Sequence, residues 1–290
     1  MIELIVVIVL LGIVGSVAGV LITKPIEAYR DQARRQQLVD QGEMSLRQIA
    51  RDVRRALPNS LRVTPVAGGW ALEMVNTVDG ARYRDEATTL DYTSDIHWLD
   101  FTQPDDQFNF LGRLNNLASA DFAAGGLRLV IYNTSATSPG SNIYAEAADI
   151  SDYQGIITRG DMSFTLGTLS PGTSSEEDYL IFSDAFMFTR KSPGQRLFVV
   201  DGPVSYICDL ATSRITRYSG YSFAASQPTV AADFSGGSSG VVVSQINSCA
   251  INYDVGSAQR GGIVTTSITL TSAASENITL LHQIHVANLP

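Results

Sequence analysis

The first 24 residues constrain the chain most strongly. Residues 2–22 are apolar apart from Glu3, three glycines and Ser16. In helical form, at about 1.5 Å of rise per residue, this run spans a hydrocarbon core of roughly 30 Å. A cleavable signal peptide is the alternative, but its apolar core would be shorter and would follow basic residues, whereas Lys24 and Pro25 lead straight into a charged segment. We therefore predict a retained transmembrane helix over residues 1–24.

Residues 25–58 continue this helix with an amphipathic pattern. Apolar positions recur every three or four residues, at Val39, Gly42, Leu46, Ile49, Val53 and Leu57. We expect this stripe to lie on a globular head. Pro25 is expected to kink the helix where it leaves the bilayer. Pro58 is expected to end it, because the residue before a proline is pushed out of the helical region, which leaves a helix of roughly 80 Å.

The face opposite the stripe is basic. It carries four arginines, Arg47, Arg51, Arg54 and Arg55, and Glu43 can pair with Arg47 one helical turn away. A solvated face is the simplest interpretation of such a run. Contact with acidic neighbours or with lipid headgroups is the alternative.

From Leu61 onward the sequence is typical of β-structure. Eight stretches alternate in polarity or are rich in β-branched residues, namely 61–66, 70–75, 127–132, 179–188, 197–207, 241–253, 263–271 and 278–286. Turn-forming residues dominate 133–142, 170–175 and 234–240. Residues 79–126 show only weak periodicity. The predicted fold class is α+β, with the long N-terminal helix packed on an antiparallel, β-rich head over residues 59–290.

Two cysteines and the charge distribution bear on the compartment. Cys208 and Cys249 suit one disulfide in an oxidising compartment, which by loop closure adds about 3 to 4 kcal/mol; two unpaired buried thiols are the alternative. The charges near the apolar run suggest the opposite orientation. No positive charge precedes Lys24, and by the positive-inside rule this alone would place the head in the cytoplasm. Residues 1–57 have a net charge of +2 and the rest of the chain −11. Such an acidic head repels a phosphate backbone, so nucleic acid is not an expected partner.

The sequence contains only weak motifs for a catalytic or metal-binding site. Residues 236–240 form a G-x-S-x-G pattern, but they precede an evident strand instead of the helix that a nucleophile elbow requires. His282 and His285 lie three apart on a predicted strand and so point to opposite faces. Acidic pairs such as Asp105 and Asp106 suit surface loops better than a calcium site. We predict no catalytic residue, no cofactor and no metal site.

Residues 2–13 resemble the N-terminal signature of type IV pilins and type II secretion pseudopilins. Ile2, Glu3 and Leu4 match that signature, whereas Met1 stands where the family has leucine, and the basic leader, its glycine and the following phenylalanine and threonine do not occur. The resemblance implies a leader encoded upstream, cut by a prepilin peptidase. It also implies that Glu3 pairs with the amino terminus of a neighbouring subunit during assembly. Gly12 would loosen the helix or allow close helix packing, although ordinary transmembrane glycine is equally consistent.

Four further blocks, residues 32–63, 202–208, 259–265 and 281–286, resemble minor pilins of MSHA pilus biogenesis, whose wider relatives are the PilW-type minor pilins and the J-type pseudopilins. This implies a non-catalytic subunit of the inner membrane with a periplasmic head, which enters the fibre or its tip. Its implied partners are other minor pilins, the major pilin and the inner-membrane assembly platform. A J-type pseudopilin of a secretion system and a membrane-anchored binding or adhesion module remain the alternatives.

Overall fold

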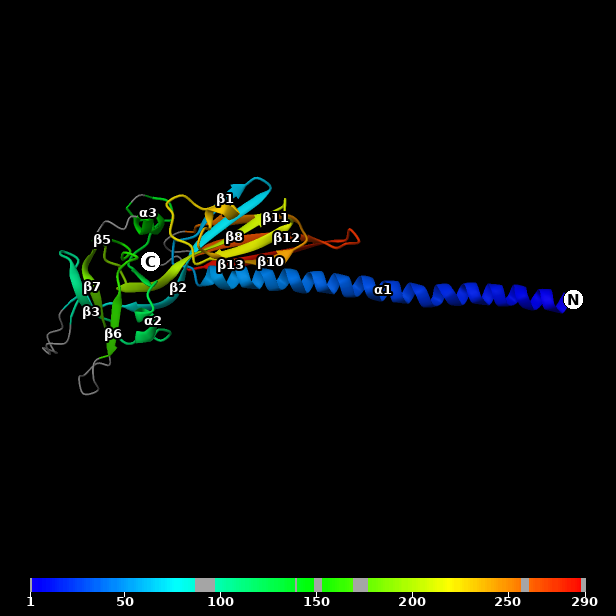
Figure 1. The fold of residues 1–290 in the computed structure, drawn as a ribbon, viewed down its shortest axis with the longest axis horizontal. Coiled ribbons are helices and arrows are strands. Elements are labelled where there is room, and N and C mark those ends of the chain that lie inside the picture. The colour runs from blue at the N-terminus through cyan, green and yellow to red at the C-terminus, as the bar shows by residue number, and fades with distance from the viewer. Residues whose placement is uncertain are drawn as a thin grey trace.

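The computed structural model describes residues 2–86, 97–138, 140–148, 153–168, 177–256 and 261–287. One long helix, α1 (Ile2–Arg54), projects from a β-rich head, and the N-terminus lies at its far end (Figure 1). Pro25 lies inside this helix without interrupting it, and Figure 1 shows no sharp bend of the kind predicted there. A proline removes a single backbone donor from the helical ladder, and the remaining bonds keep the axis continuous.

The last part of α1 packs into the head as the apolar stripe predicts. Leu46, Ile49 and Val53 are buried, while the side chains of Arg47 and Arg51 are exposed. The helix ends at Arg54, three residues earlier than expected. The reason is a competing partner for the backbone: the Leu57 N–H donates to the Val75 carbonyl at 2.8 Å, so the chain joins the neighbouring sheet before it reaches Pro58.

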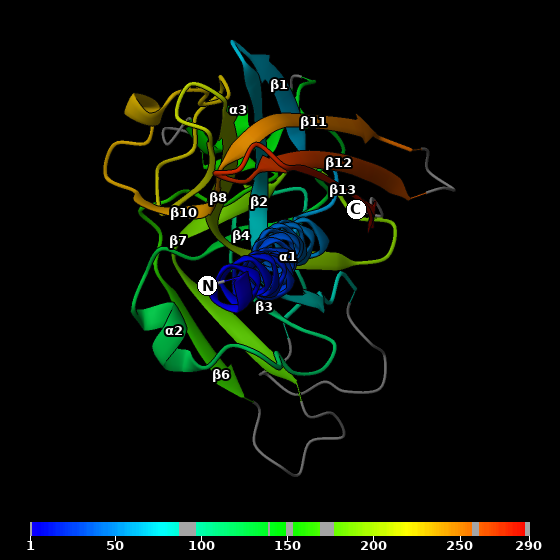
Figure 2. The ribbon, with the colours of Figure 1, turned by 90° about the vertical axis from the view of Figure 1, so that its right-hand side faces the viewer.

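The described part of the head contains three sheets. The largest has the order β1-β2-β8-β9-β10, with β4 also paired to β8. Its strands are β1 (Arg62–Val66), β2 (Gly69–Arg82), β4 (Arg128–Val130), β8 (Arg196–Asp209), β9 (Arg214–Ser219) and β10 (Ser238–Ser244). A second sheet, β11-β12-β13, contains β11 (Ile246–Asp254), β12 (Gly262–Thr271) and β13 (Asn277–Val286). Figure 2, which looks along α1, shows this second sheet lying over the helix.

The third sheet lies at the end of the head farthest from the N-terminus (Figure 1). It contains β3 (Asp105–Asn109), β5 (Gln154–Gly155), β6 (Phe164–Thr168) and β7 (Asp178–Phe188). Only the short β5–β7 pair is parallel among the described strand pairs. The short helices are α2 (Ser119–Ala123), α3 (Ile143–Ala148) and η1 (Ala231–Asp233). The predicted coarse class, an apolar N-terminal helix with a predominantly antiparallel β domain, is confirmed.

Two main cores result. The proximal core joins the stripe of α1 to the first and second sheets, whereas the distal core is aromatic. In the distal core Phe108 meets Phe110 and Phe182 edge to face, with ring centroids 5.2 and 5.7 Å apart. The two longest strands, β2 and β8, have 14 residues each and contribute side chains to both cores. They therefore connect the helix mechanically to the distal end of the head.

Several strand predictions need correction. Residues 241–253 are not one strand, because Gln245 has a φ of 65° and divides them between β10 and β11, which belong to different sheets. Residues 238–240 lie in β10 and not in a loop. Strands β3, β5, β6 and β9 were not predicted, since their sequences mix charged or polar residues with few apolar ones. The predicted turn at 170–175 lies outside the described residues.

Candidate functional site

The most unusual surface is the N-terminal stretch of α1. Every side chain described between Ile2 and Gln37 is exposed, including Ile2 at 81% and Leu21 at 68%. Exposure of a continuous apolar surface to water is unfavourable, so soluble proteins rarely expose apolar patches beyond a few hundred Å². The stretch is long and apolar enough to cross a bilayer. We therefore treat it as the candidate functional site.

The predicted assembly residues lie along this stretch. Ile2, Glu3 and Leu4 form its first turn, where the dipole of the helix favours a negative charge. Gly12 has no atom of another described element within 4 Å of the position that a Cβ would take, so it leaves room for a close neighbour. Pro25 lies beyond the apolar run. All five lie on the exposed stretch of α1, and the structure brings none of them together with the described part of the head.

A polar joint, which the sequence did not reveal, fixes the other end of α1 to the first sheet. The Asp52 carboxylate accepts hydrogen bonds from the Tyr206 hydroxyl and the Arg217 Nε, both at 2.7 Å. Burial raises the pKa of Tyr206, and its bond to Asp52 raises it further. Tyr206 on β8 and Arg217 on β9 thus fix the orientation of α1 about its own axis.

A second buried network closes the side of the first sheet. The Arg62 Nε donates to Glu73 at 2.5 Å, and Glu73 also accepts the Tyr221 hydroxyl at 2.8 Å. Desolvation by burial raises the pKa of Glu73, although the bonds from Arg62 and Tyr221 act in the opposite direction. The Arg62 guanidinium stacks on the ring of Tyr144 and donates to the carbonyls of residues 224 and 225. The network is enclosed, and its role is to hold β1 and β2 against the loop that follows β9.

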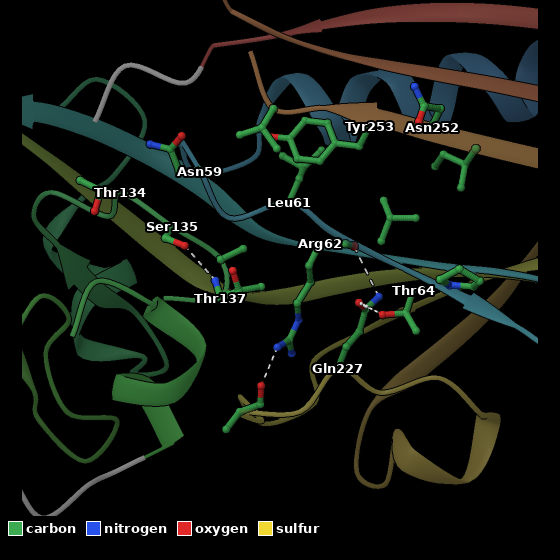
Figure 3. A pocket seen from close by; sticks show the side chains of 16 residues that line it. Asn59, Leu61, Arg62, Thr64, Thr134, Ser135, Thr137, Gln227, Asn252 and Tyr253 are labelled. Carbon is green, nitrogen blue, oxygen red and sulfur yellow. Dashed lines mark hydrogen bonds between the residues drawn. The ribbon is translucent and has the colours of Figure 1, made fainter. Parts of the chain in front are cut away.

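A groove of about 630 Å³ lies beside this network, between the edge strands β1 and β11 (Figure 3). Its lining is neutral apart from Arg62, which is already paired. The labelled polar residues Thr64, Ser135 and Gln227 bond to one another or to nearby backbone (Figure 3). Nothing in the lining points to a particular chemistry.

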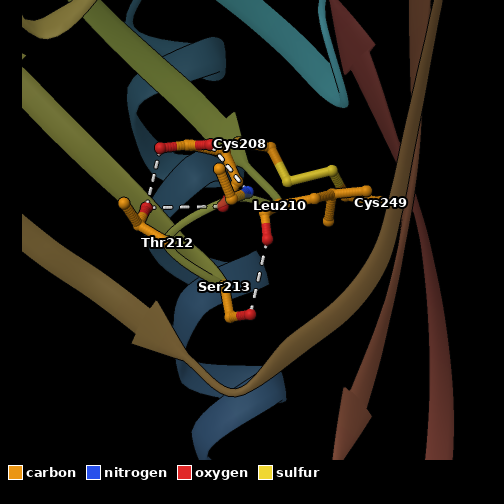
Figure 4. The surroundings of a disulfide bond; sticks show 7 residues. Cys208, Leu210, Thr212, Ser213 and Cys249 are labelled. Atoms are coloured by element: carbon orange, nitrogen blue, oxygen red, sulfur yellow. Dashed lines mark hydrogen bonds between the residues drawn. A yellow bond between two sulfur atoms is a disulfide. The ribbon is translucent and has the colours of Figure 1, made fainter.

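The predicted disulfide is confirmed. Cys208 on β8 is bonded to Cys249 on β11, with Cα atoms 6.7 Å apart (Figure 4). Because β8 belongs to the first sheet and β11 to the second, the bond clamps together the two sheets that enclose the end of α1. It therefore stabilises the proximal core directly.

The weak chemical motifs do not assemble into a site. Ser238, at the centre of the G-x-S-x-G pattern, pairs with Ser219 in the β9–β10 ladder. His282 is half-buried and His285 exposed on β13, so they occupy opposite faces of that strand. The Asp105 carboxylate accepts the N–H groups of Asp100 and Gln107. Over the ranges that the structure describes, no group of three His, Cys, Asp or Glu side chains could hold a metal ion.

The basic face of α1 is exposed as predicted. Arg47 bonds to Glu43 at 2.7 Å, whereas Arg54 and Arg55 border a pocket of about 380 Å³ beside Thr77 and Asp79. Among the described residues, one ion pair, Arg35 to Glu276, connects the exposed stretch of α1 to the β12–β13 turn, with Nε and Oε1 2.6 Å apart.

No protein-family model, curated protein or solved structure matches the chain.

Proposed function

We propose that this protein is a structural, non-catalytic subunit of a type IV pilus, a minor pilin of the MshO type. One observation carries the proposal: a single 53-residue helix has one end in the core of the head and the other end exposed and apolar. Such a helix can lie in a bilayer before assembly and against the helices of neighbouring subunits afterwards. The head stays outside the membrane in both states.

Glu3 supplies the specific assembly chemistry in this proposal. A carboxylate near the end of an apolar run is costly in lipid, by roughly 2.5 to 3.5 kcal/mol at the bilayer centre and less towards the surface. Pairing with the amino terminus of a neighbour neutralises both charges and fixes the axial register of the two helices. The partners proposed are other minor pilins, the major pilin, the inner-membrane assembly platform and, given an upstream leader, a prepilin peptidase.

The disulfide supports the proposed location. Cys208 and Cys249 are bonded to each other, and such bonds persist in oxidising compartments such as the periplasm. We therefore propose a single-pass inner-membrane protein with a periplasmic head, which moves into the fibre or its tip. The head is large and broad compared with the helix (Figure 1), and its bulk favours a position at the tip over one in a crowded shaft.

The test compares Glu3→Ala with Glu27→Ala, which removes the same charge beyond the apolar run. Both variants should reach the membrane in normal amounts, because neither touches the head. Glu3→Ala should be absent from sheared fibres, and Glu27→Ala should be present. Equal recovery of the two variants would refute the role of Glu3. If the unaltered chain remains in the membrane fraction of fibre-forming cells, the helix is only an anchor.

A further inference from the structure

A small cavity lies beside β3, at the end of the head farthest from the N-terminus (Figure 1). It has a volume of about 210 Å³, and its border includes the indole of Trp98, the carboxylates of Asp100 and Asp105, and the amides of Gln103 and Gln107. Trp98 is 46% exposed. The cavity therefore combines an accessible aromatic ring with two acidic side chains.

The segment that carries Trp98 is fixed on both sides. The His97 N–H donates to the side-chain oxygen of Asn109, and the Asn109 N–H donates to the His97 carbonyl, both at 3.0 Å. Leu99 is buried, and its N–H donates to the Arg84 carbonyl at 2.7 Å. The backbone beside the ring is thus ordered before any ligand arrives, which lowers the entropic cost of binding.

The two carboxylates give the cavity negative charge without a compensating cation. Neither Asp100 nor Asp105 forms an ion pair within the described part of the chain. Hydrogen bonds from Thr102, and then from Gln103, lower the pKa of Asp100, so this carboxylate stays ionised at neutral pH. The net charge of −11 beyond residue 57 adds to the local field. A cation in the cavity is therefore attracted electrostatically.

Much of the hydrogen-bonding capacity of these carboxylates is already used. Asp100 Oδ1 accepts the N–H and the hydroxyl of Thr102, both at 2.7 Å, and Oδ2 accepts the Gln103 amide at 2.9 Å. Asp105 accepts the N–H groups of Asp100 at 3.1 Å and Gln107 at 3.3 Å. A primary ammonium has three N–H donors and would compete with these bonds. A quaternary ammonium has no N–H donor and needs only negative charge and an aromatic surface.

We propose that this cavity binds a quaternary ammonium group of the choline type, with Trp98 against its methyl groups and Asp100 and Asp105 supplying the charge. Tryptophan attracts such cations more strongly than the other aromatic side chains do. This binding activity goes beyond the proposed structural role. It does not depend on fibre assembly, because the whole site lies within one head.

Titration of the full chain in an uncharged maltoside detergent tests the site. Choline should bind about tenfold more tightly than the uncharged alcohol in which a carbon atom replaces the nitrogen, because only choline has the positive charge. Tryptophan fluorescence can follow the binding: the chain has two tryptophans, and Trp70 is only 3% exposed, so the response should come from Trp98. Equal affinity for the two compounds, or no binding of choline, would overturn the proposal.

Variants measured by calorimetry locate the site. Trp98→Ala should weaken choline binding about tenfold, and Trp98→Phe should weaken it less, because it keeps an aromatic ring. D100N/D105N should also weaken binding about tenfold and reduce its dependence on salt. Asp184→Asn, at an exposed position of β7, is the charge control and should bind choline normally. If Trp98→Ala binds choline as the unaltered chain does, the inference is wrong.

Two further probes identify the source of the ammonium group. Glycerophosphocholine carries the headgroup of a choline lipid, so affinity equal to that of choline would assign the site to a lipid surface. Binding of choline alone would assign it to a free solute. Butylamine, a primary ammonium, should bind more weakly than choline. Tighter binding of butylamine would contradict the assignment to a quaternary cation and leave the proposed role in the fibre intact.

Discussion

Two stretches of α1 share one unbroken helix but have opposite surroundings. From Ile2 to Gln37 the described side chains are exposed. From Leu38 to Arg54 most of the apolar ones are buried in the proximal core, with Met44 exposed on the other side of the helix. As far as Ile22 the first stretch has apolar residues around its whole circumference, interrupted only by Glu3 and Ser16, whereas the second is apolar on one side only. The distribution of apolar side chains around a helix decides which environment each stretch favours. The second stretch favours one packed face, and the first favours an apolar environment on all sides.

The largest effect should come from a charge placed in the packed stretch. Ile49 is fully buried in the proximal core. Ile49→Asp should prevent the head from folding, because an unpaired buried charge costs several kcal/mol in addition to the lost apolar contacts. Loss of the cooperative thermal transition, followed by circular dichroism in detergent, measures this.

Ile8→Asp is the matched change in the exposed stretch. It should leave the thermal transition of the head unchanged and reduce membrane insertion, since a charge in the bilayer costs roughly 2.5 to 3.5 kcal/mol at its centre. If Ile8→Asp unfolds the head as well, the two stretches are not independent.

The disulfide should have the next largest effect, and again only on the packed stretch. Changing Cys208 and Cys249 together to serine should lower the free energy of unfolding by about 3 to 4 kcal/mol. Without the cross-link, the unfolded chain regains the conformational freedom of a long loop. Chemical denaturation followed by tryptophan fluorescence measures the loss. Membrane insertion of the double variant should be normal, and a change of less than about 1 kcal/mol would contradict the clamp between the sheets.

The two stretches of α1 could be predicted from the sequence, but the polar contacts that fix α1 to the head could not. The stripe at Leu46, Ile49 and Val53 is visible because its period is local. The bonds of Asp52 to Tyr206 and Arg217 are not, because their partners lie more than 150 residues apart in the chain. The one sign of these bonds in the sequence is the position of Asp52, a polar residue at the margin of the apolar stripe. In the distal sheet, β7 was predicted as residues 179–188, whereas β3, β5 and β6 were missed. These strands are short, and their apolar side chains, such as Phe108 and Phe164, form a recognisable core only together with residues distant in the sequence, such as Phe182.

A smaller effect should follow from Asp52→Asn. The Asp52 and Arg217 side chains are 15% and 28% exposed, so the pair is only partly shielded from water. The change weakens the bonds to Arg217 and Tyr206 and should cost about 1 to 2 kcal/mol in the free energy of unfolding. Asp40→Asn, at an exposed position of the same helix, is the control and should be neutral. Equal effects of the two changes would show that the joint does not fix the helix.

The smallest effect should come from Arg35→Ala. The side chain of Arg35 is 65% exposed and that of its partner Glu276 is 28% exposed. Surface ion pairs contribute about 0.2 to 1 kcal/mol and weaken with salt. The expected loss of stability is at most about 1 kcal/mol at low ionic strength and smaller in high salt. A larger loss, or one insensitive to salt, would mean that the exposed stretch depends on the head for its position.

The central claim is that the exposed stretch of α1 exchanges lipid for neighbouring helices when the chain enters a fibre. A photoreactive amino acid in place of Ile8, near the middle of the apolar run, tests it most directly. In the membrane fraction it should label lipid, and in sheared fibres it should form adducts with the N-terminal helices of other subunits. Lipid labelling alone, in cells that make fibres, would contradict the account and leave α1 as a simple membrane anchor.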